Sequence, residues 1–170
     1  MAHLSSIVYQ PRDLTYEPGA TDFIRLPLAR VELVAGKGLR GDRKAGRNPD
    51  RQVNILSAEW LQMAATRGYR TGPGQFGEQL IVAGLDVVAL PPGARLRLGA
   101  AVLEIVKGRS GCSRLEAAQG QSIAGLGPIG VLARVIVGGE IAVGDEVVVE
   151  DKLVVEDNQA AEVHVAAVGS

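Results

Sequence analysis

Short segments in which apolar and polar residues alternate recur along most of this chain of 170 residues. An alternation with a period of two predicts half-buried β-strands, because successive side chains of a strand point to opposite faces of a sheet. Glycine and proline separate the segments, as is typical of turns. The segments are ARVELVA (29–35), QVNIL (52–56), QLIVAG (79–84), ARLRLG (94–99), AVLEIV (101–106), VLARVIV (131–137) and EIAVGDEVVVE (140–150).

Many short strands with few helices predict an all-β fold, that is, mostly β with one or two short helices. Closing such strands into a barrel removes exposed sheet edges, so we expect a closed or partly open β-barrel. Two-residue joins at Gly99–Ala100 and Gly138–Gly139 predict tight antiparallel hairpins, since glycine readily adopts the positive φ angles that such turns need.

The first helix is expected from Ala58 to Arg67, with Ser57 as its N-cap and Gly68 just after its end. A second short helix is expected directly after the single cysteine, over 113–118, and is ended by a glycine at position 120.

Length and composition indicate one domain over 1–170, with a core at about 29–150 and a peripheral strand or tail at 151–170. A formal net charge of −1 and only 4% aromatic residues argue against a nucleic-acid partner. The first residues, MAHLSSIVYQ, lack a signal-peptide pattern, and no segment is long and apolar enough to span a bilayer. With one cysteine there is no intrachain disulfide. We therefore expect a cytoplasmic protein without a membrane or nucleic-acid partner.

The single cysteine, Cys112, lies in VKGRSGCSRL (106–115), where Arg109 and Arg114 flank it. Nearby guanidinium groups and a helix amino terminus favour the thiolate, which is the nucleophilic form of cysteine. The alternative is that Cys112 is a small buried hydrophobic residue, as unreactive free cysteines commonly are. The glycine and arginine surroundings favour a functional sulfur.

A basic loop forms the second unusual stretch, GKGLRGDRKAGRNPDRQ (36–52). Its six basic residues are interleaved with glycines and two acidic residues, Asp42 and Asp50. Guanidinium forks match the geometry of phosphate, molybdate or carboxylate oxygens, so the loop is a candidate anion-binding site. The alternative is a solvated loop whose charges only aid solubility.

A third stretch, GPGQFGEQLIVAGLD (72–86), places Glu78 where a glycine-rich turn enters a strand. Glu78 and Asp86 could form an acid–base pair, or Glu78 could cap a turn while Asp86 holds a loop through backbone hydrogen bonds. The glycine pattern GLGPIG (125–130) is followed by a strand pattern instead of a helix, which argues against dinucleotide binding. The two histidines and one cysteine show no metal-ligand spacing.

Taken in order, GDRKAG…RQVNIL, GQFGEQLIVAGLD, LPPGARLRLGAAVLEIVKGRSGCSRL and GVLARVIVGGEIAVGD closely resemble the MOSC domain family, named for the carboxyl-terminal part of molybdenum cofactor sulfurases. The resemblance runs from about Val31 to Val149 and is that of a small stand-alone member. It implies a mostly β, MOSC-type barrel with a groove for a molybdopterin-type cofactor or another anionic ligand.

In that family the cysteine matching Cys112 carries sulfur as a persulfide or serves in the reduction of N-hydroxylated substrates, alongside a sulfur donor or redox partner protein. The chain departs from the family pattern at Lys44, Gln79 and Gly111, where histidine, asparagine and proline are common. No segment corresponds to the pyridoxal-phosphate-dependent part of larger sulfurases. The residues that we expect to carry function are Cys112 as the catalytic group and Asp42, Arg43, Lys44, Arg51, Glu78, Arg109 and Arg114 as ligand-binding groups, with no metal ligands.

The alternative function is a non-catalytic β-barrel module that binds an anion or a protein, with a structural cysteine. Every catalytic expectation depends on folding that brings the thiol and the cations to one pocket wall.

Overall fold

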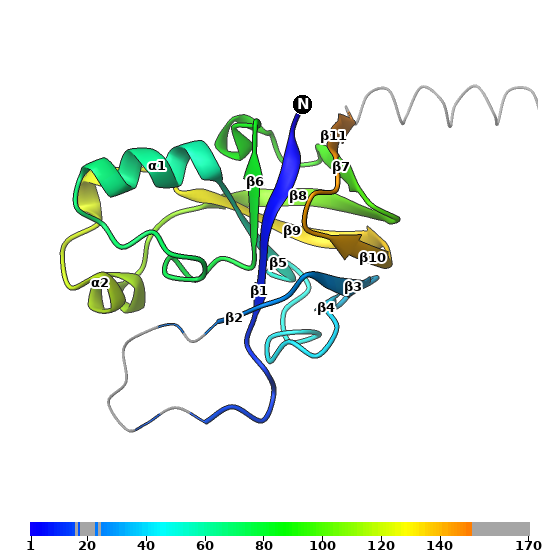
Figure 1. Ribbon diagram of the computed structural model, residues 1–170, viewed down its shortest axis with the longest axis horizontal. Coiled ribbons are helices and arrows are strands. Elements are labelled where there is room, and N and C mark those ends of the chain that lie inside the picture. The colour runs from blue at the N-terminus through cyan, green and yellow to red at the C-terminus, as the bar shows by residue number, and fades with distance from the viewer. Residues whose placement is uncertain (16, 18–22, 24, 151–170) are drawn as a thin grey trace, which may run out of the picture.

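The computed structural model describes residues 1–15, 17, 23 and 25–150. The peripheral strand or tail expected at 151–170 lies outside these residues. The described chain is mostly β, as the alternating pattern predicts, with two α-helices (Figure 1).

The larger sheet has eight strands in the order β11-β7-β8-β9-β5-β6-β1-β2. Its neighbouring strands are antiparallel except β5 and β6, which are parallel because helix α1 joins them. The strands are β1 (His3–Tyr9), β2 (Leu26–Pro27), β5 (Val53–Ser57), β6 (Leu80–Ala83), β7 (Arg95–Leu98), β8 (Ala101–Arg109), β9 (Gly130–Val137) and β11 (Val147–Glu150).

A smaller sheet, β10-β3-β4, joins β3 (Arg30–Val34), β4 (Gly38–Leu39) and β10 (Gly139–Ala142). The hairpin expected at Gly99–Ala100 is confirmed, because β7 pairs with β8 across it. The hairpin expected at Gly138–Gly139 is wrong, because β10 leaves β9 and pairs with β3 in the other sheet. The segment 140–150 is also divided, since a turn separates β10 from β11.

We expected a closed or partly open barrel, and no closed barrel is found in the part of the chain that the structure describes. The larger sheet ends at β11 and β2. Near β11, the amino-terminal end of β1 meets the turn after β10 through the hydrogen bonds Leu4 N to Asp145 O and Val147 N to Ala2 O. One isolated bridge, His3 with Glu146, is the extent of the pairing there. Because this contact is too short to continue the ladder, the sheet remains open.

Both helices lie at one end of the molecule, on the left in Figure 1. Helix α1 (Ala58–Thr66) follows β5 directly, and Gly68 has a φ of 87° just after it, as expected. Ser57 occupies the N-cap position, but its hydroxyl donates to Leu85 O and accepts from Val87 N, so it does not cap the helix. Helix α2 (Ser113–Gln119) begins directly after Cys112, also as expected.

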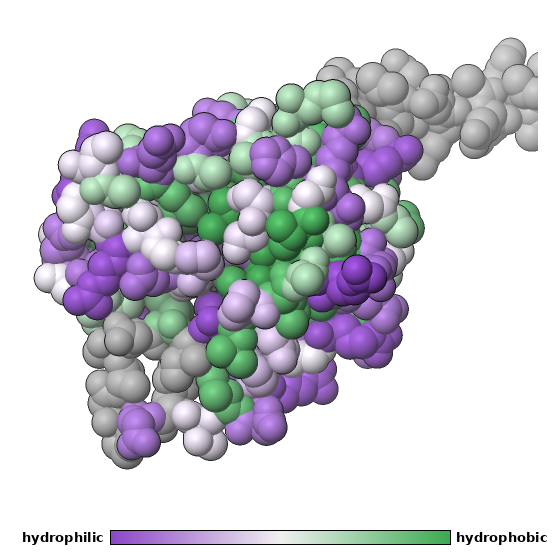
Figure 2. Space-filling model, in the orientation of Figure 1, coloured by the Kyte–Doolittle hydropathy of each residue, from purple (hydrophilic) through white to green (hydrophobic). Residues whose placement is uncertain are grey.

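Two groups of apolar side chains are buried. The larger lies between the strands, and the smaller joins the two helices to the sheet through Leu56, Leu61, Phe76 and Leu115. Trp60 packs edge-on against Phe76, with the ring centroids 5.2 Å apart. Burying one such leucine or phenylalanine contributes about 1.5–3 kcal/mol. Figure 2 shows polar side chains over most of the rim of the visible face, with apolar ones towards its centre.

Two 3-10 helices, η1 (Val87–Ala89) and η2 (Ala124–Leu126), complete the described elements. Asp86 caps η1 by accepting a hydrogen bond from Val88 N, which confirms the loop-holding alternative for this carboxylate.

Candidate functional site

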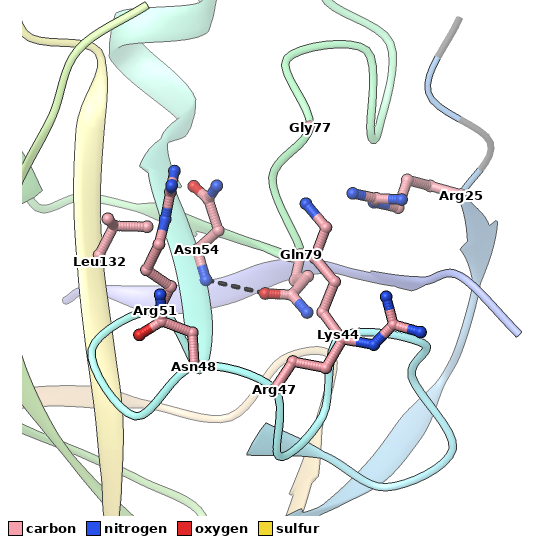
Figure 3. A pocket seen from close by; sticks show the side chains of 9 residues that line it. All are labelled: Arg25, Lys44, Arg47, Asn48, Arg51, Asn54, Gly77, Gln79 and Leu132. Atoms are coloured by element: carbon pink, nitrogen blue, oxygen red, sulfur yellow. Dashed lines mark hydrogen bonds between the residues drawn. The ribbon is translucent and has the colours of Figure 1, made fainter. Parts of the chain in front are cut away.

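A cationic cavity of about 270 Å³ opens between the basic loop and the ends of β5 and β6. No acidic residue of the described chain lines it. Figure 3 shows Arg51 and Leu132 on one side, Lys44 and Arg25 on the other, and the Gln79 amide between them. The lining consists of four cations, three amides and two further residues, namely Arg25, Lys44, Arg47, Arg51, Asn48, Asn54, Gln79, Gly77 and Leu132.

The cavity perturbs the amine of Lys44. Partial burial, followed in order of effect by the positive charges of Arg25, Arg114, Arg109 and Arg51, lowers the pKa of Lys44 to about 8. Although much of the Lys44 surface remains open to solvent, its ammonium lies among like charges. An anion bound here would relieve this repulsion.

Asp42 holds the wall of the cavity without lining it. Its buried carboxylate accepts hydrogen bonds from Gln10 N, Lys44 N and the Nε2 of Gln79, at 2.9, 3.0 and 3.1 Å. The Oε1 of Gln79 accepts from Asn54 N at 2.9 Å, drawn as the dashed line in Figure 3. Asp42 therefore positions Lys44 and Gln79, and the Gln79 amide spans the gap between the basic loop and β5.

Arg109, at the end of β8, is almost fully buried beside the cavity. Its guanidinium donates to Asn54 Oδ1 at 3.2 Å and to Phe76 O. The pKa of Arg109 is lowered to about 10, chiefly by burial, which outweighs the opposite effect of the charges of Glu78 and Cys112. A thiolate at Cys112 is thus close enough to Arg109 for a favourable charge interaction.

Glu78 is buried and its carboxylate points into the turn before β6. It accepts hydrogen bonds from Gly74 N and Phe76 N, so it caps this turn. Burial raises the pKa of Glu78, while those backbone hydrogen bonds and the charge of Arg109 lower it. It is neither a lining residue of the cavity nor paired with Asp86 through any hydrogen bond among the described residues.

Cys112 is exposed and lines a separate, wider depression of about 570 Å³. The residue before it, Gly111, packs so tightly that a Cβ there would lie 1.9 Å from Ile123 Cδ1. A side chain at position 111 would therefore require the buried Ile123 side chain to move. The other lining residues are Ser110, Ser113, Glu116, Ala124, Gly127 and Pro128.

The expectation of one shared pocket wall is therefore wrong, because the two hollows have no lining residue in common. Phe23 connects the cavity with helix α2, because Arg25 lines the cavity and Arg114 belongs to α2. The guanidinium carbons of Arg25 and Arg114 lie 5.6 and 5.0 Å from the centre of its ring. Gly77, which lines the cavity, would place a Cβ 3.1 Å from that ring and 3.3 Å from the guanidinium of Arg109.

The structure brings Lys44 and Arg51 together in the cavity, with Arg109 and Arg114 close by, but places Arg43 elsewhere. Arg43 donates to Leu14 O and lines a different hollow. The sequence did not single out Arg25, Asn54 and Gln79 as lining residues. The position of Asn54 could have been noticed, because it is a polar residue within the apolar strand segment QVNIL. Nothing in the sequence around Arg25 indicates that it lines a cavity.

No three His, Cys, Asp or Glu residues cluster as candidate metal ligands within the described ranges. Within the same ranges, neither helix is long and apolar enough to cross a membrane.

The fold and this site define the class of protein. The MOSC domain family model matches residues 42–148, so the chain belongs to the MOSC domain family. Curated proteins include no significant match.

Solved structures resemble the chain over most of its length. The crystal structure of YiiM from Geobacillus stearothermophilus has a TM-score of 0.68 and 22% identity, covering 89% of this chain and 76% of that one. YiiM from Escherichia coli has a TM-score of 0.65 and 23% identity, covering 88% and 70%. The YUAD protein from Bacillus subtilis has a TM-score of 0.65 and 20% identity, covering 88% and 96%. At these identities, the likeness establishes the fold.

Proposed function

We propose that this MOSC domain protein binds an anionic ligand of the molybdenum-cofactor type in the cationic cavity and uses Cys112 for chemistry beside it. The chemistry is sulfur transfer through a persulfide or a part in reducing N-hydroxylated substrates. The observation that supports this proposal is that a cavity lined by four cations lies beside Arg109, whose charge also interacts with the exposed Cys112.

The lining residues suit an anionic ligand. Arg25, Lys44, Arg47 and Arg51 offer charge-assisted hydrogen bonds, and the amides of Asn54 and Gln79 add directional contacts. A molybdopterin-type cofactor would be held by these residues through its anionic groups, and it would supply the oxidation–reduction chemistry of its metal. The residues of the chain would bind and orient it.

For sulfur transfer, the thiolate of Cys112 attacks the terminal sulfur of a donor persulfide, R–S–SH. A new S–S bond forms between Cys112 Sγ and this terminal sulfur, which gives Cys–S–SH. The S–S bond of the donor breaks and the donor leaves as R–S⁻, so no net oxidation is required. The positive charge of Arg109 lies near enough to Cys112 for the two charges to interact. Because Cys112 is exposed, a donor protein can reach it. Reduction of a substrate would instead require electrons from a partner protein, since the chain has one cysteine.

The test is persulfide formation on the folded protein. After exposure to a low-molecular-weight persulfide donor, intact mass spectrometry should show one added sulfur atom on the wild type and none on Cys112→Ser. A persulfide on Cys112→Ser, or none on the wild type, would remove the sulfur-carrying role.

The second candidate is a non-catalytic module that binds an anion or a protein through the same cavity. The separation of the two hollows favours it, because binding there needs no thiol. The exposure of Cys112 argues against a cysteine that fills core volume. This candidate predicts that Cys112→Ser retains the full anion affinity, and that no persulfide forms on the wild type.

A further inference from the structure

A second arginine-lined hollow lies beside the cationic cavity, on the other side of the basic loop. It measures about 260 Å³ and is lined by Arg12, Arg43, Ala45 and Arg47. None of these lining residues is acidic. Arg47 also lines the cationic cavity, so one guanidinium side chain is common to both hollows.

The backbone builds this second hollow. The segment that carries Arg12 is tied to the basic loop in both directions, because Arg43 N donates to Gln10 O at 2.8 Å and Gln10 N donates to the Asp42 carboxylate at 2.9 Å. An isolated bridge pairs Pro11 with Asp42. The guanidinium of Arg43 is anchored by donating to Leu14 O at 3.1 Å. Arg12 and Arg43 are therefore held next to each other by main-chain contacts.

Turns within the basic loop then direct its side chains to two sides. Ala45 N donates to Asp42 O, and Arg47 N donates to Lys44 O, both at 3.1 Å. As a result Lys44 lines the cationic cavity, Arg43 lines the second hollow, and Arg47 reaches both. In Figure 3 Arg47 lies on the side of Lys44 and Arg25, away from Arg51.

We propose that the two hollows together bind one ligand that carries two anionic groups, such as a diphosphate or a longer polyphosphate ester. One group would occupy the cationic cavity, the second would lie against Arg12 and Arg43, and Arg47 would contact both. This inference rests on the proposed function, because it assumes that the cavity binds an anion.

The charges favour this ligand class. The formal net charge of the whole chain is −1, yet six cations line the two hollows. The positive charges of the neighbouring arginines add to the effect of burial in lowering the pKa of Lys44. A ligand with a single anionic group can contact the cations of one hollow. A ligand with two such groups can contact the cations of both hollows, which meet at Arg47. Guanidinium groups bind phosphate oxygens bidentately, which suits a phosphate in each hollow.

The test compares orthophosphate with tripolyphosphate by calorimetry, at one pH and one ionic strength, on the full chain. Each added charge-assisted contact is worth about 1.5–3 kcal/mol, so the wild type should bind tripolyphosphate at least about ten times more tightly than orthophosphate. Arg12→Ala should remove this gain and leave orthophosphate binding unchanged. Arg51→Ala should weaken binding of both ligands.

Arg30→Ala is the matched control, since Arg30 is an exposed residue of the small sheet whose ion pair with Glu140 is long, at 3.6 Å. It should change neither affinity. The proposal of a ligand that spans both hollows is overturned if Arg12→Ala still binds tripolyphosphate more tightly than orthophosphate by the same factor. It is also overturned if Arg12→Ala and Arg30→Ala weaken the binding of both ligands equally. A different result, orthophosphate binding that is absent or unaffected by Arg51→Ala, overturns the proposed function itself.

Discussion

The walls of the cationic cavity come from strands and from a loop held by the buried carboxylate of Asp42, whereas Cys112 lies on an exposed turn at the start of a short helix. In the cavity, buried polar groups make hydrogen bonds to one another and hold the charged residues at its mouth. Around Cys112, Gly111 packs against Ile123, and Glu116 N donates to Cys112 O at the start of α2.

The difference separates binding from reactivity. Charges that recognise an anion must be held in place before the ligand arrives, and this requires a satisfied buried network. A sulfur that exchanges with another molecule must be accessible. Arg109 connects the two regions, because it donates to Asn54 of the cavity and interacts with the charge of Cys112. Apart from this connection through Arg109, the two hollows have separate lining residues, so changes to one region are expected to leave most of the other unaltered.

The largest effect is expected from Asp42→Ala. Removing the carboxylate leaves the buried donors of Gln10, Lys44 and Gln79 without their acceptor, which should lower the free energy of unfolding by about 3 kcal/mol. Urea unfolding measures this loss. Asp50→Ala, an exposed residue of the same loop, is the control and should have little effect. An equal loss in both variants would show that Asp42 does not organise the cavity.

Arg51→Ala should weaken binding of molybdate or phosphate by about 30-fold, because a charge-assisted hydrogen bond contributes about 2 kcal/mol. Calorimetry gives the affinity. The rate at which a thiol reagent labels Cys112 should not change, since Arg51 does not line its depression. If labelling slows as much as binding weakens, the two regions are not independent.

Gly111→Ala tests the other region. A Cβ 1.9 Å from Ile123 Cδ1 must displace the buried Ile123 side chain, so we expect a loss of about 1–3 kcal/mol in stability and a changed labelling rate at Cys112, with anion affinity retained. Gly108→Ala is the matched control, because a Cβ at Gly108 meets nothing within 4 Å. Identical melting curves for the two variants would contradict the tight contact.

The smallest effect is the pH dependence of anion binding. Lys44 has a pKa lowered to about 8, so it is charged below pH 8 and loses its charge as the pH rises through that value. Anion affinity should therefore fall by up to about five-fold above pH 8, because one partly exposed ion pair contributes about that much to binding. Lys44→Met should abolish this dependence in calorimetric titrations. If the pH dependence of anion affinity persists in Lys44→Met, another titrating group causes it.

Much of the fold could be predicted from the chain alone. The alternation of apolar residues located most strands, and both helices lie where the capping glycines indicated. Strand β1 was not predicted, because HLSSIVY lacks clear alternation. The sheet to which β10 belongs could not be predicted either, since local pattern shows that a segment is a strand but not which strand it pairs with.

The candidate site was predicted in part. Lys44 and Arg51 were identified because basic residues gather in one glycine-rich loop. Arg25 and Gln79 were not identified as lining residues, since they reach the cavity only through folding. Arg43, adjacent to Lys44 in sequence, points to the other hollow because the turns of the basic loop direct neighbouring side chains to different sides.

The sequence by itself determined the mostly β character, the two helices, the family and the presence of one cysteine beside two arginines, since each depends on neighbouring residues. Tertiary structure alone decided that the thiol and the cations occupy separate hollows, that Asp42 and Glu78 stabilise turns and loops instead of lining the cavity, and that the sheet stays open. These features depend on contacts between residues far apart in the chain, where burial and packing determine which groups meet.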